Sequence, residues 1–339
     1  MEKAITLLEE LLSDPKANQE ALDNYVNDIL KTRQDAKTNQ NQIFSTLVNY
    51  GTYGQNSPSL DILSEAELKA ITTDELIAII KGLTKHNHRI LYYGPSDIKF
   101  MKKTLEKLHD TPKKLLPVIP PKRYEPLAVE KNNVYVVNYD ANQSYIYEVF
   151  KGVHFDSVLV PAVSMYNNYF GGGMNAIVFQ EMREKRSLAY SANSTYREPS
   201  YPEGYYTNSA FIATQNDKIA EALNAFNELF EEMPLSEKAF SLAKESILSD
   251  INTKRITKMN VIWSFLNNEK MGYNYDRRMD IFKHIPSLQL TDVKDFNNKY
   301  IKGNSKTYLI LGRESDMDEQ TLSKFGEVKK LNLEQIFGY

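Results

Sequence analysis

Arg183 and Tyr190 are two residues whose side chains could act together in chemistry, and they stand seven positions apart. Arg183 lies near the end of a predicted helix, and Tyr190 lies near the start of the strand expected after it. A guanidinium and a phenol both donate hydrogen bonds to a carbonyl oxygen, and negative charge developing on that oxygen strengthens both bonds. A structural explanation is also open. Arg183 belongs to a run of charged residues from Glu181 to Arg186, and Tyr190 could be a core aromatic residue.

Three consecutive glycines, Gly171, Gly172 and Gly173, stand shortly before this pair. They lack the spacing of a phosphate-binding loop, because no Lys-Ser or Lys-Thr pair follows them and no further glycine lies three residues on. Glycine has no Cβ atom, so a run of three permits a tight turn with close approach of the backbone. We therefore predict a turn between two helices here in preference to a nucleotide site.

Metal-binding and nucleophilic residues are sparse. The chain has no cysteine, which excludes disulfides, thiolate metal sites and a cysteine nucleophile. It has no Gly-x-Ser-x-Gly elbow, and no histidine lies in a His-x-x-Glu-His motif. His86 and His88 could chelate a metal at a strand edge, but a polar pair at the beginning of a strand is the simpler explanation. The sequence predicts no metal site in this chain. The histidines are His86, His88, His109, His154 and His284.

The composition is that of an ordinary soluble globular protein, with 42% hydrophobic and 25% charged residues among 339. That length suits two domains, or one domain and a fragment of another. The net charge of −3 gives no reason to expect nucleic acid or an anionic membrane as a partner. No apolar run approaches the roughly 18 residues that a membrane span requires. The first twelve residues are acidic with helical spacing and do not resemble a signal peptide, so the compartment stays open.

Hydrophobic periodicity predicts helices through most of the first hundred residues, followed by a short buried strand from His88 to Gly94 and a helix from about Ser96 to His109. Four prolines then mark an extended linker. Five more strands are expected at 133–139, 143–153, 188–196, 204–213 and 307–312. One helix is expected at about 156–169, and a second helix follows the glycines and ends at about 185. A long helical run is expected at about 217–299.

An internal repeat organises the chain. When the sequence is displaced by 218 positions, Ile29-Leu30 falls on Ile247-Leu248, Gly54 on Gly272, Thr73-Asp74 on Thr291-Asp292, and Gly94 on Gly312. The second copy has strands, helices and a closing strand, whereas the first has only the rear half. We therefore expect a partial module at residues 1–110, a Pro-rich linker at 111–131 and a complete module at 132–339. The fold class is α+β, with helices packed on antiparallel-rich sheets.

The segment from Tyr169 to Ser191 resembles the M16 family of zinc peptidases, the pitrilysin or insulinase-type inverzincins, and specifically their modules that hold no zinc. Those modules have a glycine turn, a helix ending in Arg-Glu-Lys (here Arg183 to Lys185) and a strand beginning Leu-Ala-Tyr-Ser (here Leu188 to Ser191). Ser187 stands where they commonly have glycine. The resemblance covers the second copy of the repeat, and the first hundred residues look like the rear half of the preceding module.

The resemblance implies a division of labour. In this family four α+β modules form two bowl-shaped halves around a chamber, and the first module binds zinc through His-x-x-Glu-His. This chain would be the C-terminal, non-catalytic half, which encloses peptides for cleavage by a zinc-bearing N-terminal half in the same polypeptide or a partner subunit. The zinc cofactor would belong to that half. Arg183 and Tyr190 would orient the peptide near the scissile bond, and Gly171, Gly172, Gly173 and Met174 would line the chamber.

Two other functions stay open. M16-like modules without zinc also serve as structural or binding subunits of larger complexes, although retention of both Arg183 and Tyr190 favours a substrate role. An independent hydrolase would need a metal site assembled from His86, His88 and carboxylates. Because the first module looks incomplete, we expect the chain to be a fragment of a longer polypeptide and to form a homodimer when isolated.

Overall fold

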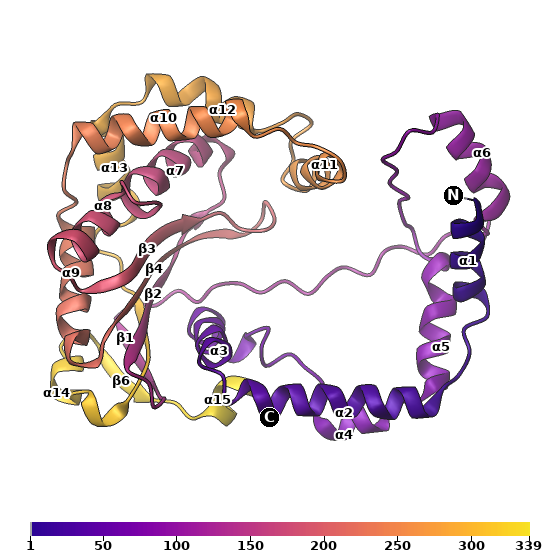
Figure 1. Cartoon of the computed structure of the whole chain (residues 1–339), viewed down its shortest axis with the longest axis horizontal. Helices are drawn as coiled ribbons and strands as arrows, with labels where there is room; N and C mark the ends of the chain where they lie inside the picture. The colour runs from indigo at the N-terminus through magenta and orange to yellow at the C-terminus, as the bar shows by residue number, and fades with distance from the viewer. Residues whose placement is uncertain (1) are drawn as a thin grey trace. The chain divides into compact units, whose positions relative to one another are not determined.

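The computed structural model describes residues 2–339, which divide into two compact units (Figure 1). The first unit runs to Thr38 and continues over Leu63–Arg123, with Tyr339 added. The second contains Asn39–Ile62 and Tyr124–Gly338. These units cut across the boundaries expected from the repeat, because a helix that precedes the linker packs in the second unit. The description of the chain as a partial module and a complete one remains a prediction.

The second unit is built on a six-stranded mixed sheet with the order β3-β4-β2-β5-β1-β6. Neighbours from β3 to β5 are antiparallel, whereas β1 runs parallel to β5 and to β6. The predicted α+β fold class is confirmed, and five strands match predicted ones. The sixth, β6, is short and charged, so it carried no hydrophobic alternation. The strands are β1 (Asn133–Asn138), β2 (Gln143–His154), β3 (Ala189–Arg197), β4 (Tyr205–Gln215), β5 (Thr307–Gly312) and β6 (Glu327–Lys330).

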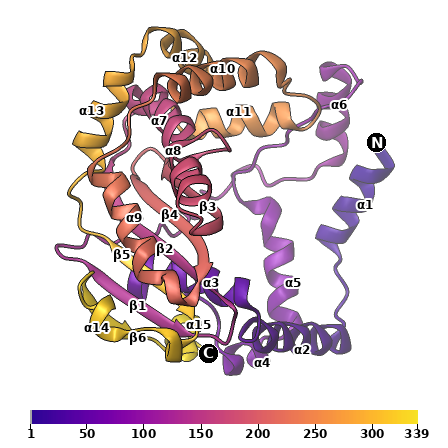
Figure 2. The ribbon, with the colours of Figure 1, turned by 60° about the vertical axis from the view of Figure 1, so that its left-hand side comes forward.

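Helices lie on both faces of this sheet, because alternate side chains of a strand point to opposite sides. On one face Ile146 and Ile310 join a large core with α7, α9, α10 and α13, and Figure 2 shows α8 and α9 beside β3 and β4. On the other face lies α3. The helices are α3 (Gln40–Tyr53), α7 (Val160–Tyr166), α8 (Ile177–Phe179), α9 (Ile219–Glu231), α10 (Glu237–Thr253), α11 (Asn260–Lys270), α12 (Arg278–His284), α13 (Leu290–Tyr300), α14 (Glu319–Leu322) and α15 (Leu333–Phe337).

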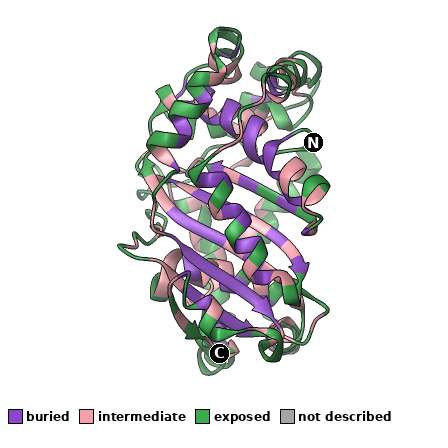
Figure 3. Ribbon diagram, turned by 90° about the vertical axis from the view of Figure 1, so that its left-hand side faces the viewer, coloured by how far each residue is buried: buried purple, intermediate pink, exposed green. Residues whose placement is uncertain are grey.

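Aromatic packing fixes the strands that carry the candidate site. Tyr196 of β3 stacks on Tyr206 of β4 with ring centroids 5.0 Å apart, and Phe44 of α3 meets Tyr145 of β2 edge to face at 5.3 Å. Such pairs add to the area they bury because ring edges and faces carry opposite partial charge. Figure 3 shows buried residues along the central strands of the sheet. β3 lies at the sheet edge, and Tyr196 anchors it to β4.

A buried carboxyl group beside a lysine interrupts the apolar core. Glu148 of β2 is fully enclosed, its nearest cation is the Lys306 Nζ at 3.5 Å, and neither carboxylate oxygen has a hydrogen-bond partner among the described residues. Lys306 also donates to the Asn227 Oδ1 at 3.0 Å. Burial raises the pKa of Glu148 to about 7, against the opposing effect of Lys306.

Replacing Glu148 with glutamine should flatten the pH dependence of stability. The folded state holds the Glu148 proton up to about pH 7, whereas the unfolded state loses it near the ordinary value of 4.5. The free energy of unfolding should therefore fall by about 3 kcal/mol as pH rises through that window. Urea unfolding at pH 5 and pH 8 would measure this, with Glu221→Gln, an exposed site on α9, as the control. Equal pH dependence in Glu148→Gln and the parent would contradict the assignment.

The first unit is helical, as its periodicity predicts. Ser64 and Thr72 form capping boxes at the starts of α4 and α5, and a small core joins Leu22, Val26 and Leu68. Capping side chains satisfy the free backbone N–H groups of a first turn. The helices are α1 (Glu2–Ser13), α2 (Gln19–Ala36), α4 (Glu65–Ala70), α5 (Thr73–Gly82) and α6 (Ile98–Leu108).

The strand predicted from His88 to Gly94 is wrong. This segment forms no strand, and its apolar side chains Ile90, Leu91 and Tyr93 are exposed. The nearest bridge joins His86 to Leu116, within the otherwise irregular Pro-rich stretch. A strand needs a neighbouring strand for its backbone N–H and C=O groups, and the described residues of the first unit contain none. The apolar run therefore stays extended without a sheet.

Candidate functional site

The glycine turn is shaped by two separate requirements, and both fit the predicted helix-to-helix turn. A π-helical turn, η4 (Asn167–Gly171), ends against the edge strand. A Cβ atom on Gly171 would lie 1.8 Å from the Ser194 carbonyl oxygen of β3, so only glycine permits this approach. Gly173 has φ +92°, a left-handed conformation that side chains disfavour. The turn thereby brings the helix end directly against β3.

The helix after the turn carries Arg183. α8 continues into a π-helical segment, η5 (Gln180–Lys185), so the two form one helical run. Its end is closed by a hydrogen bond from the Leu188 N–H to the Met182 carbonyl at 2.9 Å. Between them Ser187 has φ +50°, which is left-handed. Glycine adopts a left-handed backbone conformation without strain, which explains why M16 modules commonly have glycine at this position. Ser187 adopts the same conformation at a cost in conformational energy.

Replacing Ser187 with glycine should raise the free energy of unfolding by about 1 kcal/mol. A left-handed non-glycine residue costs roughly 1–2 kcal/mol, and part of the gain is offset by the greater freedom of glycine in the unfolded chain. Urea denaturation followed by circular dichroism would measure the change. Ser191→Gly, in β3 at a residue without positive φ, is the matched control and should destabilise. A lower free energy of unfolding for Ser187→Gly than for the parent would contradict the conclusion that Ser187 is strained.

Tyr190 sits at an irregularity in β3. Ala189 pairs with Thr214 and Ser191 pairs with Ala213, so Tyr190 is an extra residue between two successive partners on β4. A β-bulge of this kind redirects one side chain and is frequent next to functional sites. The Tyr190 side chain is 77% exposed, which excludes the alternative of a core aromatic residue.

The structure brings Arg183 and Tyr190 together. The guanidinium carbon of Arg183 lies 4.5 Å from the centre of the Tyr190 ring and 4.9 Å from the centre of the Phe179 ring. Its Nε lies 3.4 Å from the Glu184 Oε1, and the side chain is 36% exposed. A cation over an aromatic face is attracted by the negative charge of that face. The two rings and the carboxylate thus hold the guanidinium in place at the surface.

This arrangement leaves hydrogen-bond donors available. The Tyr190 hydroxyl has no hydrogen-bond partner among the described residues, and Arg183 has five N–H donors with one ion pair. A guanidinium and a phenol held side by side can donate to one carbonyl oxygen or to neighbouring ones. The pair on its own can bind and polarise a peptide carbonyl. It supplies no nucleophile and no general base.

The other predicted residues, Gly171 to Met174, form the turn that precedes the helix of Arg183. Gly171 is buried against β3, whereas Gly172, Gly173 and Met174 are exposed, Met174 to 73%. The turn is held by a hydrogen bond from the Gln180 Nε2 to the Met174 carbonyl oxygen at 2.6 Å. The sequence interpretation overlooked Gln180 and Phe179. Phe179 could have been found, because it precedes Arg183 by four residues and so shares its helix face. The bond from Gln180 depends on the shape of the turn and left no sequence signal.

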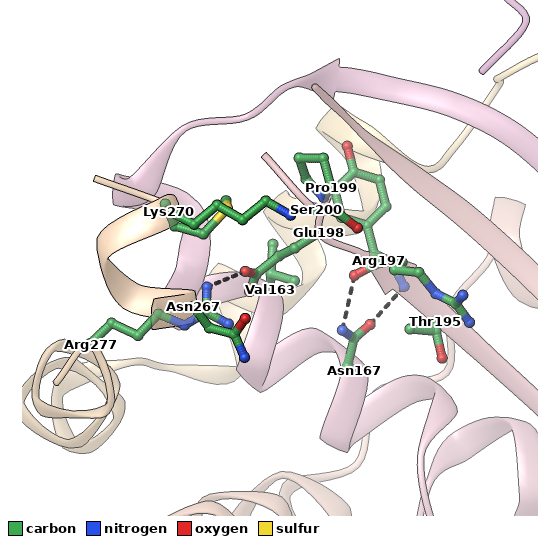
Figure 4. A pocket seen from close by; sticks show the side chains of 12 residues that line it. Val163, Asn167, Thr195, Arg197, Glu198, Pro199, Ser200, Asn267, Lys270 and Arg277 are labelled. Carbon is green, nitrogen blue, oxygen red and sulfur yellow. Dashed lines mark hydrogen bonds and ion pairs between the residues drawn. The ribbon is translucent and has the colours of Figure 1, made fainter. Parts of the chain in front are cut away.

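A cavity of about 450 Å³ lies at the far end of β3 (Figure 4). Asn167 of η4 closes the strand edge there: its amide donates to the Tyr196 carbonyl at 3.0 Å and accepts from the Tyr196 N–H at 2.8 Å. Arg277 pairs with Glu198 across the cavity. Other lining residues include Arg197 and Lys270. Seven residues of strand place this cavity roughly 23 Å along β3 from Tyr190.

The residues present do not fit the zinc ion of M16 peptidases. The helix expected to match the zinc helix is α7, and it turns Val160, Pro161 and Val163 into the core. Within residues 2–339, no three or more histidine, aspartate or glutamate side chains gather in a metal-binding arrangement. In the same range, every helix is too short or too polar to cross a bilayer.

Comparisons with known proteins identify the family to which this chain belongs. The profile of the peptidase M16 inactive domain matches residues 70–247, and the chain belongs to that family. A zinc protease of Rickettsia bellii, itself uncharacterized, is 28% identical over 153 residues, which are 42% of this chain and 34% of that protein. The chain therefore matches about a third of the length of this curated relative.

Solved structures share the fold. The M16 inactive domain from Pseudomonas fluorescens superimposes with a TM-score of 0.61 at 17% identity, covering 91% of this chain and 74% of that one. An M16-like peptidase from Alicyclobacillus acidocaldarius has a TM-score of 0.63 at 11% identity, with the same coverage. The ferredoxin protease FusC, solved with Arabidopsis ferredoxin, has a TM-score of 0.67 at 13% identity, covering 92% of this chain and 34% of that one.

Proposed function

We propose that this chain is the substrate-orienting half of an M16-like zinc peptidase. In this function it encloses peptides together with a zinc-bearing half, and Arg183 and Tyr190 hold the peptide backbone while the zinc half cleaves it. Membership of the M16 inactive-domain family supports the pairing with a catalytic half. Family membership does not by itself assign a substrate role. The support for that role is the Arg183–Tyr190 pair on the surface of this chain.

The observation that carries the substrate role is the Arg183–Tyr190 pair itself. Its guanidinium is stacked 4.5 Å from an exposed phenol ring, and that phenol stands on a β-bulge. Stacking on a guanidinium requires only the ring of Tyr190, yet the residue is 77% exposed and its hydroxyl has no hydrogen-bond partner among the described residues. Two donors held rigidly at a surface lose little entropy on meeting a carbonyl oxygen. This arrangement favours a substrate role over a purely structural one.

The chemical contribution is to stabilise charge, since the pair contains no nucleophile. When water adds to a peptide carbonyl, its oxygen gains negative charge, and hydrogen bonds from fixed donors grow stronger. The zinc half would supply the metal, the activated water and the base. The substrate class is then any peptide able to present its backbone at this surface. The likeness to FusC, at 13% identity, concerns the fold and does not extend ferredoxin to this chain.

The test is reconstitution with a fluorogenic peptide. The chain alone should show no turnover, and mixing it with the zinc-bearing M16 half should give turnover that a chelator abolishes. Lys185→Ala is the matched control, because Lys185 lies on the same helix and pairs with Glu181, away from the Arg183–Tyr190 stack. Turnover by the purified chain alone would overturn the proposal. So would a mixture that forms a complex and cleaves equally well without Arg183 and Tyr190.

A further inference from the structure

Three side chains from separate elements of the first unit meet in one cluster. Glu9 lies on α1, His109 caps the end of α6, and His88 lies in the extended segment that formed no strand. The Nε2 atoms of His88 and His109 face each other at 2.8 Å, with the two rings nearly perpendicular at 87°. The side chains of Glu9 and His109 are mostly covered, at 19% and 16% exposure.

The opposite ring nitrogens fix the tautomers of both histidines. His109 Nδ1 lies 2.6 Å from the Glu9 Oε1, and His88 Nδ1 lies 2.7 Å from the His86 carbonyl oxygen. Carboxylate and carbonyl oxygens accept hydrogen bonds, so each Nδ1 must carry the hydrogen. In a neutral imidazole the Nε2 atom then has a lone pair. Two lone pairs therefore point at each other across the 2.8 Å contact, which is repulsive unless a positive species lies between them.

We propose that His88 and His109 bind a divalent transition-metal ion of the zinc class through their Nε2 atoms. A histidine that ligates a metal typically donates its other N–H to a carboxylate or a backbone carbonyl, and here Glu9 and the His86 carbonyl are those acceptors. Imidazole nitrogen suits Zn²⁺ and Cu²⁺. Two nitrogens on one tetrahedral zinc lie about 3.3 Å apart, so the contact widens by about 0.5 Å. The segment of His88 lies outside any helix or strand and can yield by this amount.

This site is separate from peptide cleavage. It has two protein ligands, so water or another ligand would complete the coordination, and it lacks the His-x-x-Glu-His arrangement of the peptidase zinc. The sequence suggested His86 with His88 as a pair, but His86 turns its Nδ1 to the Pro117 carbonyl at 2.9 Å. The bound ion would join α1, α6 and the segment of His88, which otherwise has no sheet to hold it.

The test is zinc titration of the full chain without an affinity tag, by calorimetry in a buffer that does not bind metal. We expect one Zn²⁺ per chain and a raised Tm on binding. His88→Ala and His109→Ala should each weaken binding at least tenfold, and Glu9→Gln should weaken it about tenfold. With Cu²⁺, electron paramagnetic resonance should show two coupled imidazole nitrogens in the parent and one in His88→Ala.

Each control variant lacks one histidine, as His88→Ala and His109→Ala do. His86→Ala and His284→Ala should bind zinc as the parent does, because neither ring is a ligand in the proposed site. Circular dichroism shows whether each variant is folded. A folded parent that binds no zinc would overturn the proposal. The 2.8 Å contact between the two Nε2 atoms would then be explained by a proton shared between the rings. Unchanged zinc binding in His88→Ala or His109→Ala would overturn it as well, and a loss in His86→Ala equal to that in His88→Ala would place the ligands elsewhere.

Discussion

Arg183→Ala is expected to lower the turnover number of the reconstituted peptidase about 100-fold. Removing one fixed donor to a developing oxyanion typically costs 100- to 1,000-fold in kcat. Because the donor acts mainly on charge that develops during the reaction, kcat and kcat/KM should fall together while KM changes little. Steady-state kinetics with a fluorogenic peptide and the zinc-bearing half would measure both constants.

Conservative variants separate the contributions of the phenol hydroxyl, the positive charge and the planar guanidinium to kcat. Tyr190→Phe keeps the ring beneath the guanidinium and removes only the hydroxyl, so its loss of kcat reports the phenol donor. Arg183→Lys keeps the charge and loses the planar donor fork, so it should rescue activity only in part. Lys185→Ala should behave as the parent. A rise in KM with unchanged kcat in Arg183→Ala would show that the pair binds substrate and transition state equally, against the proposed role.

Gly171→Ala is expected to destabilise the second unit by about 4 kcal/mol or to prevent its folding. The added Cβ atom would lie 1.8 Å from the Ser194 carbonyl oxygen, and the obstacle is backbone of β3, which cannot rotate away as a side chain could. Relief requires η4 to separate from β3, at the place where Asn167 also bonds the strand edge. Thermal and urea denaturation followed by circular dichroism would measure the loss.

Gly172→Ala is the matched control at the adjacent position. Its Cβ atom would meet the Asn167 carbonyl oxygen at 3.2 Å, φ is negative, and the residue is exposed. This variant should lose less than about 1 kcal/mol. Equal stability of Gly171→Ala and Gly172→Ala would mean that η4 and β3 do not approach as closely as described, and it would weaken the account of how the site is positioned.

Much of the fold follows from patterns that sequence carries directly. The strands β1, β2, β3, β4 and β5 were predicted within one or two residues. Alternating or β-branched and aromatic residues indicate the first four strands, and a short, continuously apolar run indicates the buried β5. The M16 family, expected from the segment around Arg183, is confirmed by the match over residues 70–247. The predicted strand at 88–94 failed because hydrophobic alternation says nothing about whether a partner strand is present.

The candidate site was predicted as a list of residues and not as a geometry. Arg183 and Tyr190 were chosen from a motif, and their stacking results from a β-bulge and from a left-handed Ser187, neither of which sequence reveals. Their role near a scissile bond stays a proposal. The contact of His88 with His109 joins residues 21 positions apart, so it depends on how α6 folds back and could not be seen in local spacing.

The position of α3 has a consequence for how this chain can be divided. α3 precedes the Pro-rich stretch, yet it lies so close to the sheet that a Cβ atom on Gly51 would be 2.3 Å from the Leu309 side chain of β5. A fragment begun at Asn132, the apparent boundary in the sequence, would lose α3 and leave Leu309 and Tyr145 exposed to water. Such a fragment should aggregate, so the sheet of the second unit could not be expressed or exchanged between proteins without α3.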